Sequence, residues 1–482
     1  MIINLIKVDE IEATRALVES ILEKIDRLLN VSYWRLIFGK VIYFADVLDF
    51  ANGVPKLSHS YAITSGIGLF VYHEGGTGFS STNIISEDTI NRIIKMALKS
   101  AKISANIRKL RLDLPEELGK FGNSIPPKVL YPPTDERFTD LLNQIKDEAF
   151  YLADKNSLKL KNIIASIGFY LYHRSIYDSL GNELGYTYPI YGADISVTSK
   201  SQGNVFEGYE SVFAIGGLEL LKRNETSPNY LLKGAFKNML NKIRGKKIKP
   251  TKTDIVAGPD LSGTVAHESF GHLSEADSVI DGSSYLSDKV GKMLGPEILN
   301  IVDTGRFIQG GIWLPFDDEG VATRDIYLVE KGIFKGYLHS IITASLMNKK
   351  STGNGRASSP MVYPIVRMRN TYILPGDATK EELFEELKRG IFIESVDGGE
   401  TKDSGTFIFT AKNAYYIENG EIKFPIKNIT IRGHIADFLS NIKMLSKEFK
   451  IQIGFCEKND QTILVGLGGP YVLVKDAIIG GS

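Results

Sequence analysis

The chain runs LKNIIASIGFYLYHRSIYD from Leu160 to Asp178, and the alternation of apolar and polar residues continues to about Phe213. Tyr, Ile and Val are enriched in this stretch, and a period of two residues is typical of strands with one buried face. The stretch therefore predicts several strands of an antiparallel sheet.

A second strand-rich stretch lies upstream, after an expected helix. Apolar residues recur every three or four positions from Asp9 to Asn30, which predicts a helix with one buried face. Between Tyr33 and Asn83, the runs Gly66–Tyr72 and Thr77–Ser81 flank Glu74-Gly75-Gly76. Two β-rich runs around a glycine-containing turn predict a hairpin.

Two further helices are expected, from Ser86 to about Ser104 and from about Asp135 to Asn156. A serine followed by two carboxylates suits the free amide groups at a helix start. Proline pairs at 126–127 and 132–133 cannot continue a helix, so we expect a connector near residues 112–134. The first half of the chain is therefore mixed α+β.

The composition is that of a soluble globular protein. The chain has 482 residues, with 57 Lys and Arg against 57 Asp and Glu and 43% hydrophobic residues. This length predicts two or three domains, and the zero net charge argues against a general attraction to nucleic acid. A single cysteine, no signal segment and no apolar run of about 20 residues predict a cytoplasmic protein without a membrane partner.

One dense basic stretch runs from Lys242 to Lys252. It lacks interleaved aromatic residues, so a solvated linker explains it as well as a nucleic-acid contact does. We expect no nucleic-acid partner.

The most informative stretch is His267-Glu268-Ser269-Phe270-Gly271-His272. In the common H-E-x-x-H pattern, two histidines four residues apart share one helix face. Five residues apart, they are separated by roughly 140° on a regular helix. A widened turn or a break at Gly271 would bring them together, so we expect an irregular helix here. Glu268 would then point into the same site, where a general base acting on a metal-bound water belongs.

Two imidazoles need a third protein ligand, and Cys456 is the best candidate. It lies in Ile453–Asp460, which we interpret as a short polar turn between two β-like runs. On composition alone, a lone cysteine is more often a small buried hydrophobic residue. The two histidines could likewise be ordinary members of a helix.

Together with other segments, this pattern resembles the TldD/PmbA family of zinc peptidases, once called modulators of DNA gyrase, and specifically its catalytic TldD branch. The likeness extends over most of the chain and is weaker in the N-terminal half. The segments that carry it are His267–His272, Phe316–Gly320, Ser351–Arg356, Arg369–Tyr372, Gly466–Pro470 and the Cys456 turn. Ser269-Phe270 depart from the smaller or more aliphatic residues expected there.

The resemblance implies one zinc ion per chain, with His267, His272 and Cys456 as ligands and Glu268 as the catalytic base. It implies a metallopeptidase that hydrolyses flexible or unfolded peptides by a metal-activated water. It also implies a dimer, either of two identical chains or with a PmbA-type chain that lacks the zinc motif.

Other residues are weaker candidates for contact with a substrate. Arg356, Asn354 and His339 could stabilise an oxyanion or hold substrate, although structural roles explain them equally well. Two glycine pairs could let a peptide backbone pair with a strand edge, or could simply form tight turns; they are Gly353 with Gly355, and Gly398 with Gly399.

We therefore expect an α+β chain with an N-terminal mixed α/β domain over residues 1–228. A C-terminal, sheet-rich metallopeptidase domain is expected over residues 229–482, with the zinc motif on an irregular helix. The alternative is a non-catalytic, peptide-binding or regulatory subunit with a structural zinc, against which Glu268 and an open ligand position argue.

Overall fold

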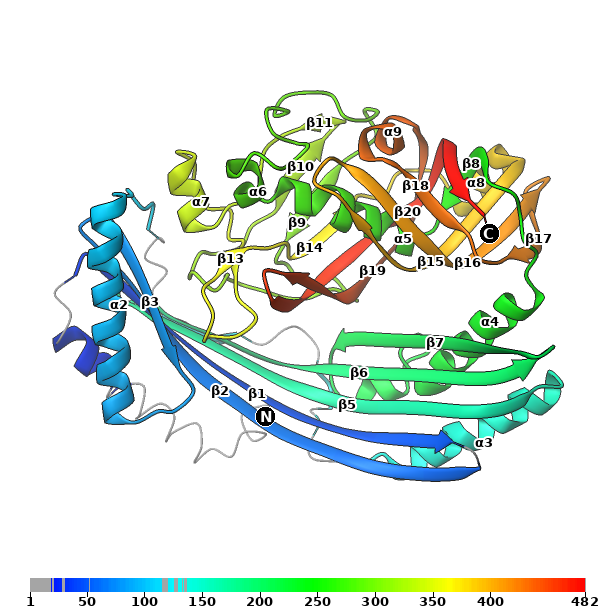
Figure 1. Ribbon diagram of the computed structural model, residues 1–482, viewed down its shortest axis with the longest axis horizontal. Coiled ribbons are helices and arrows are strands. Elements are labelled where there is room, and N and C mark those ends of the chain that lie inside the picture. The colour runs from blue at the N-terminus through cyan, green and yellow to red at the C-terminus, as the bar shows by residue number, and fades with distance from the viewer. Residues whose placement is uncertain are drawn as a thin grey trace.

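The computed structural model describes residues 19, 21–27, 31–51, 53–114, 120–124, 129–131, 133 and 137–481. Within them, a sheet of long curved strands lies beneath a second, sheet-rich unit (Figure 1). This is the mixed architecture, with a sheet-rich C-terminal part, that the sequence predicts.

The first sheet has the strand order β3-β2-β1-β5-β6-β4, and β7 also pairs with β6. Its strands are β1 (Tyr33–Ala51), β2 (Val54–His73), β3 (Gly76–Thr82), β4 (Lys120–Ser124), β5 (Lys159–Asp178), β6 (Glu183–Ser201) and β7 (Asn204–Ile215). The antiparallel strands expected from Leu160 to Phe213 are confirmed as β5, β6 and β7.

The predicted hairpin is confirmed as β2 and β3, whose pairing closes at His73 and Gly76. Glu74 and Gly75 form its turn with φ angles of 52° and 89°, as a two-residue hairpin turn requires. Residues 19 and 21–27 are helical, and the rest of the helix expected from Asp9 to Asn30 lies outside the described residues.

Both later helices of the first half are confirmed, with shifted ends. They are α2 (Glu87–Ile107), which Ser86 caps, and α3 (Thr139–Lys155). The expected connector lies partly outside the described residues, but Lys120–Ser124 within it pairs with β6 as the parallel strand β4. The proline pattern could not reveal this strand, because a partner about 60 residues away in the chain supplies its hydrogen bonds.

Helices and the second unit cover opposite faces of the first sheet. On one face, α3 and α4 (Pro228–Arg244) pack against β5 and β6 through a cluster that includes Ile145, Phe236, Ile163 and Ile195. The opposite face packs against the second unit. The domain boundary expected at residue 228 stays a prediction.

The second sheet has the order β11-β10-β9-β14-β20-β18-β16-β15-β8, with β17 on β16 and β19 on β20. Its strands are β8 (Thr251–Ala257), β9 (Ile301–Thr304), β10 (Ile326–Glu330), β11 (Ile333–Phe334), β14 (Asn370–Ile373), β15 (Arg389–Thr401), β16 (Thr406–Glu418), β17 (Glu421–Ile426), β18 (Thr430–His434), β19 (Ile442–Lys458) and β20 (Gln461–Gly480). A separate pair joins β12 (Gly355–Arg356) and β13 (Ile365–Val366).

The short helix η2 (Leu218–Leu221) lies between β7 and α4. Short helices also lie between the strands of the second sheet: α5 (Pro259–Thr264), η4 (His272–Ser274), α6 (Ala276–Ile280), α7 (Ile341–Leu346), α8 (Lys380–Leu387) and α9 (Ile435–Ser440). Among the described residues, no helix is both long and apolar enough to cross a membrane.

Buried charges join the two units. Arg174 on β5 pairs with Asp318 at 2.8 Å, and their side chains are 2% and 8% exposed. Nearby, Arg35 on β1 donates to the carbonyl oxygen of Glu319. The acidic segment Asp317–Glu319 therefore holds the first sheet against the loops of the second unit.

We expect Asp318→Asn to destabilise the protein by about 3–5 kcal/mol, because it leaves the buried guanidinium of Arg174 without its counter-charge. Urea denaturation of both proteins measures the difference. Glu421→Gln is the matched control, since the Glu421–Lys423 pair lies on the surface and should leave the unfolding midpoint unchanged. Equal midpoints for Asp318→Asn and the native chain would contradict this role.

Candidate metal centre

The helix that carries the histidine motif is a π-helix over Val265–Gly271. It continues directly from α5, and the amide of His272 donates to the carbonyl of His267, five residues earlier. This wider ring places the two histidines on the same side of the helix. The irregular helix expected from the spacing is confirmed.

Gly271 is required by this packing. A Cβ atom added at Gly271 would lie 1.9 Å from the sulfur of Met368, which is fully buried. The absence of a side chain lets the end of the π-helix approach the segment before β14 (Asn370–Ile373). Any residue larger than glycine at this position would therefore require the core around Met368 to shift.

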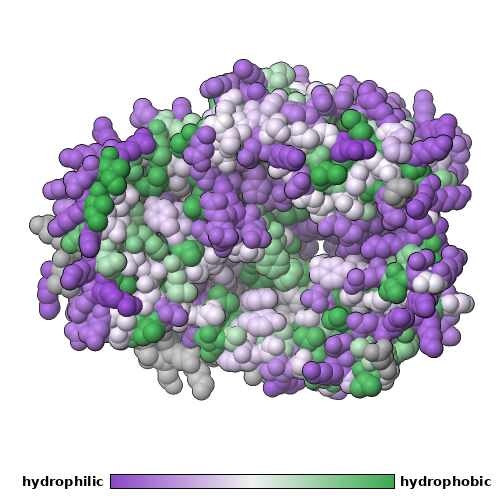
Figure 2. Space-filling view, viewed as in Figure 1, coloured by the Kyte–Doolittle hydropathy of each residue, from purple (hydrophilic) through white to green (hydrophobic). Residues whose placement is uncertain are grey.

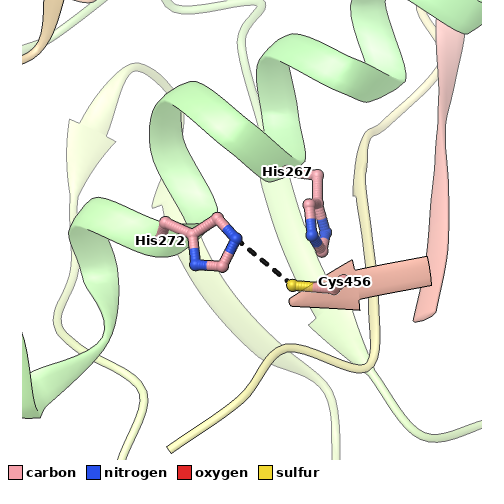
Figure 3. Close-up of side chains that lie close together, drawn as sticks. All are labelled: His267, His272 and Cys456. Atoms are coloured by element: carbon pink, nitrogen blue, oxygen red, sulfur yellow. Dashed lines mark hydrogen bonds between the residues drawn. The ribbon is translucent and has the colours of Figure 1, made fainter. Parts of the chain in front are cut away.

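The structure brings His267, His272 and Cys456 together. One potential ligand atom from each lies within 4.8 Å of the other two, and the sulfur of Cys456 is 3.2 Å from Nε2 of His272. The imidazole rings have centroids 5.2 Å apart and are nearly perpendicular. Figure 3 shows both rings and the sulfur turned toward a common centre.

Cys456 belongs to strand β19, and the interpretation of its surroundings as a turn is wrong by a few residues. The turn is at Asn459 and Asp460, which have positive φ angles, whereas Cys456 pairs with Ile463 of β20. A strand directs alternate side chains to opposite faces, so Cys456 points to the histidines and is 2% exposed.

His267 carries the clearest sign that the three side chains bind something. It is 1% exposed, and within the described residues neither of its ring nitrogens makes a hydrogen bond of ordinary geometry. A buried polar group without a partner costs about 1–3 kcal/mol, which a metal–nitrogen bond would remove.

The three residues match the ligands that zinc prefers. A tetrahedral zinc ion, with bonds of about 2.0–2.3 Å, keeps its ligand atoms roughly 3.3–3.6 Å apart. The observed limit of 4.8 Å exceeds this separation by about an ångström, a gap that small side-chain rotations can close. The residues therefore fit a zinc ion with one ligand position left open.

A second layer of residues, which the sequence reasoning missed, orients His272. Nδ1 of His272 lies 3.0 Å from the carboxylate of Glu275, which is buried. Lys458 Nζ lies 2.9 Å from the same carboxylate oxygen and also pairs with Asp277. A carboxylate on the outer nitrogen of a histidine is a common feature of metal sites. The spacing His272-x-x-Glu275 was a usable signal for this contact.

The charges of the cluster favour a thiolate. Against the effect of burial, the neighbouring imidazoles of His267 and His272 lower the pKa of Cys456 to about 5. Burial also opposes the charged form of His272, but Glu275 and Cys456 raise its pKa well above the usual value. Despite its burial, Glu275 has its pKa lowered to about 2 by His272 and Lys458.

Glu268 lies at the open side of the cluster. Its side chain is 32% exposed, and its carboxylate is 3.9 Å from Nε2 of His272. The carboxylate can therefore contact a water molecule or substrate beside the three candidate ligands and exchange a proton with it.

The weaker candidates have mainly structural contacts. Both amide hydrogens of Asn354 are used, on the Asp303 carboxylate and the Arg367 carbonyl. Arg356 donates to the carbonyl oxygens of Met368 and Leu464. His339 is 4% exposed, and within the described residues its Nδ1 has no partner. None of the three belongs to the cluster of candidate ligands.

The two glycine pairs differ in their surroundings. Gly353 has a φ of 74°, and a Cβ on Gly355 would meet Glu319, so turn geometry and packing explain both. Gly398 and Gly399 are exposed on β15 (Arg389–Thr401). That strand reaches the motif through a 2.8 Å hydrogen bond between the hydroxyl groups of Thr401 and Ser269.

Comparison with known families gives two matches. Residues 250–481 match the PmbA/TldA metallopeptidase C-terminal domain, and residues 46–101 match the PmbA/TldA metallopeptidase domain 1. A metalloprotease of Methanocaldococcus jannaschii is 33% identical over 458 residues, which are 94% of this chain and 98% of that protein. A zinc metalloprotease TldD homolog of Saccharolobus solfataricus is 30% identical, covering 94% of this chain and 96% of that protein.

Solved structures share the fold. A Thermotoga maritima protein described as a proposed modulator of a DNA gyrase has a TM-score of 0.75 at 21% identity, covering 97% of this chain and 100% of that one. TldE from Thermococcus kodakarensis has a TM-score of 0.71 at 17% identity, covering 96% and 100%.

In metal-free protein, we expect the Cys456 thiolate to titrate near pH 5, far below the ordinary value of about 8.5. The chain has one cysteine, so ultraviolet thiolate absorbance reports on this group alone. Since folding lowers this pKa, the thiolate adds stability above about pH 8.5 that is lost as the pH falls through about 5. His272→Ala should raise the midpoint of the Cys456 titration. A midpoint near the ordinary value of about 8.5 in the native chain would show that the imidazoles do not lower the pKa of this thiol.

Proposed function

Because the chain belongs to the PmbA/TldD metallopeptidase family, we propose that it is a zinc-dependent peptidase that hydrolyses flexible or unfolded peptides. The observation that carries this proposal is the buried, unpartnered imidazole of His267 beside Cys456 and His272, with Glu268 at the open side.

In this proposal, His267, His272 and Cys456 hold one zinc ion, and Glu275 keeps the His272 ring in place. When bound, zinc polarises a peptide carbonyl and makes a water molecule more acidic. Glu268 takes a proton from the attacking water and delivers it to the nitrogen of the leaving amine. Lys458 compensates the charge of Glu275, so that this carboxylate stays an acceptor for His272.

A flexible peptide can reach the site by pairing with β15. This strand pairs with β16 (Thr406–Glu418) on one edge, and in the described residues its other edge pairs with β8 only at Ile391–Ile393. The edge from Asp397 to Glu400 is thus open next to Thr401, which bonds to the motif helix. Backbone pairing there would bind peptides with little sequence preference.

Two features favour a catalytic subunit over one that only binds peptides around a structural zinc. Structural zinc sites are usually closed by four protein ligands, whereas the part of the chain that the structure describes brings three together here. Glu268 also places a partly exposed carboxylate at the open side, and a purely structural zinc site does not require a carboxylate there. We propose a dimer as the working unit, of two such chains or with a TldE-like chain.

We expect Glu268→Gln to lower peptide hydrolysis by at least about 100-fold while the protein still binds one zinc ion. The change removes the proton acceptor and keeps the size of the side chain. Hydrolysis of an unstructured peptide and elemental analysis of the same sample measure the two effects. Cys456→Ala is the comparison and should lose both zinc and activity; full activity in Glu268→Gln would exclude Glu268 as the base.

We expect Glu275→Ala to weaken zinc binding by about 10–100-fold, because His272 loses the acceptor that fixes its ring. Competition with a coloured chelator measures the affinity without reference to activity. Glu275→Gln should retain part of the affinity, since an amide oxygen can still accept from Nδ1. Glu457→Gln is the control, an exposed residue of the same strand as Cys456; equal affinities in all four proteins would remove Glu275 from the site.

A further inference from the structure

A cavity of about 180 Å³ lies between the first sheet and the hairpin of β19 and β20. Six of its sixteen lining residues are aromatic, and Figure 2 shows the surface hollowed between the two units. The aromatic lining residues are Tyr170, Tyr172, Tyr186, Tyr188, Phe213 and Phe455.

The cavity shares a wall with the candidate zinc site. Phe455 and Leu464 are paired across the hairpin and line the cavity, and Ile463, which pairs with Cys456, lines it as well. Cys456 itself does not line the cavity and belongs to the core of the second unit. One step along β19 therefore separates a cavity residue from a candidate zinc ligand.

The tyrosines of the lining stack on one another, and the lining carries no uncompensated charge. Tyr188 stacks on Tyr172 and on Tyr186, with centroids 5.9 and 5.6 Å apart. Asp318 is neutralised by Arg174 at 2.8 Å. The guanidinium of Arg356 is used on two backbone carbonyl oxygens. An uncharged, apolar group is therefore the favoured occupant.

The volume fits one ring or one branched aliphatic side chain. An apolar cavity of about 150 Å³ takes up a single benzene molecule, so 180 Å³ accepts a group of about that size. Aromatic walls favour an aromatic occupant through edge and stacking contacts.

We propose that this cavity is a side-chain pocket for the peptide substrate and takes one large apolar or aromatic residue. The proposal rests on the proposed peptidase function and names the feature that its substrates share. Phe455 and Cys456 turn to opposite faces of the hairpin, so the pocket receives a residue that is remote from the scissile bond.

The test compares peptides that are identical except for Phe or Ser at one position, scanned along the peptide. We expect the native protein to prefer Phe by at least about tenfold in kcat/KM at one position remote from the cleaved bond. Val41→Trp, which fills the cavity from β1, should reduce this preference to less than about twofold. Ser358→Phe fills it from the opposite wall and should do the same if Val41→Trp fails to fold.

Val205→Trp is the matched control, because Val205 is an exposed valine of the first sheet that does not line the cavity. It should keep the native preference. Zinc-dependent hydrolysis with no Phe preference at any position would overturn the pocket and leave the peptidase function standing. An equal loss of kcat/KM for the Phe and Ser peptides in Val41→Trp and Ser358→Phe would also overturn the pocket.

Binding to Glu268→Gln protein, measured by fluorescence anisotropy with the same labelled peptides, separates the two proposals. If the native protein hydrolyses no peptide, the pocket is still supported when the Phe peptide binds more tightly than the Ser peptide and Val41→Trp abolishes this difference. Equal binding of both peptides would overturn it.

Discussion

The hydrogen bond from the His272 amide to the His267 carbonyl spans five residues, and the geometry of the site depends on this spacing. In a regular helix the two imidazoles would point in directions roughly 140° apart. The π-helix turns them to one side, and Gly271 permits it because any side chain there would collide with Met368. The core around Met368 therefore decides the geometry of the two candidate zinc ligands on this helix.

The hairpin of β19 and β20 is the second constraint on the site, because one of its faces carries a candidate zinc ligand and the other lines the cavity. Cys456 faces the histidines, Lys458 reaches Glu275, and Phe455 lines the aromatic cavity on the other face. The alternation of a strand places these side chains without any special loop. A shift of one residue in the register would move Cys456 to the cavity and disassemble the cluster.

Buried charges then hold the layers together. Arg174 and Asp318 join the first sheet to the loops of the second unit, and Arg369 pairs with Asp303 where β9 meets β14. Buried pairs of this kind contribute little net stability compared with apolar residues, but each fixes one arrangement, because the loss of either partner leaves a charge in the interior. The relative placement of sheet, cavity and candidate zinc site depends on these pairs.

The sequence alone determined the strands after Leu160, the hairpin around Glu74 and Gly75, the helices α2 and α3, and the irregular helix of the motif. The strands, the hairpin and the two helices follow from patterns of residues that are near one another in the chain, and the irregular helix was expected from the five-residue spacing of the two histidines. The tertiary structure decided the rest: the parallel pairing of β4, the strand position of Cys456, the contact of Lys458 with Glu275, and the aromatic cavity. Cys456 and His272 are 184 residues apart, and only the packing of a hairpin against a helix, through a shared apolar core, brings such distant side chains within 3.2 Å.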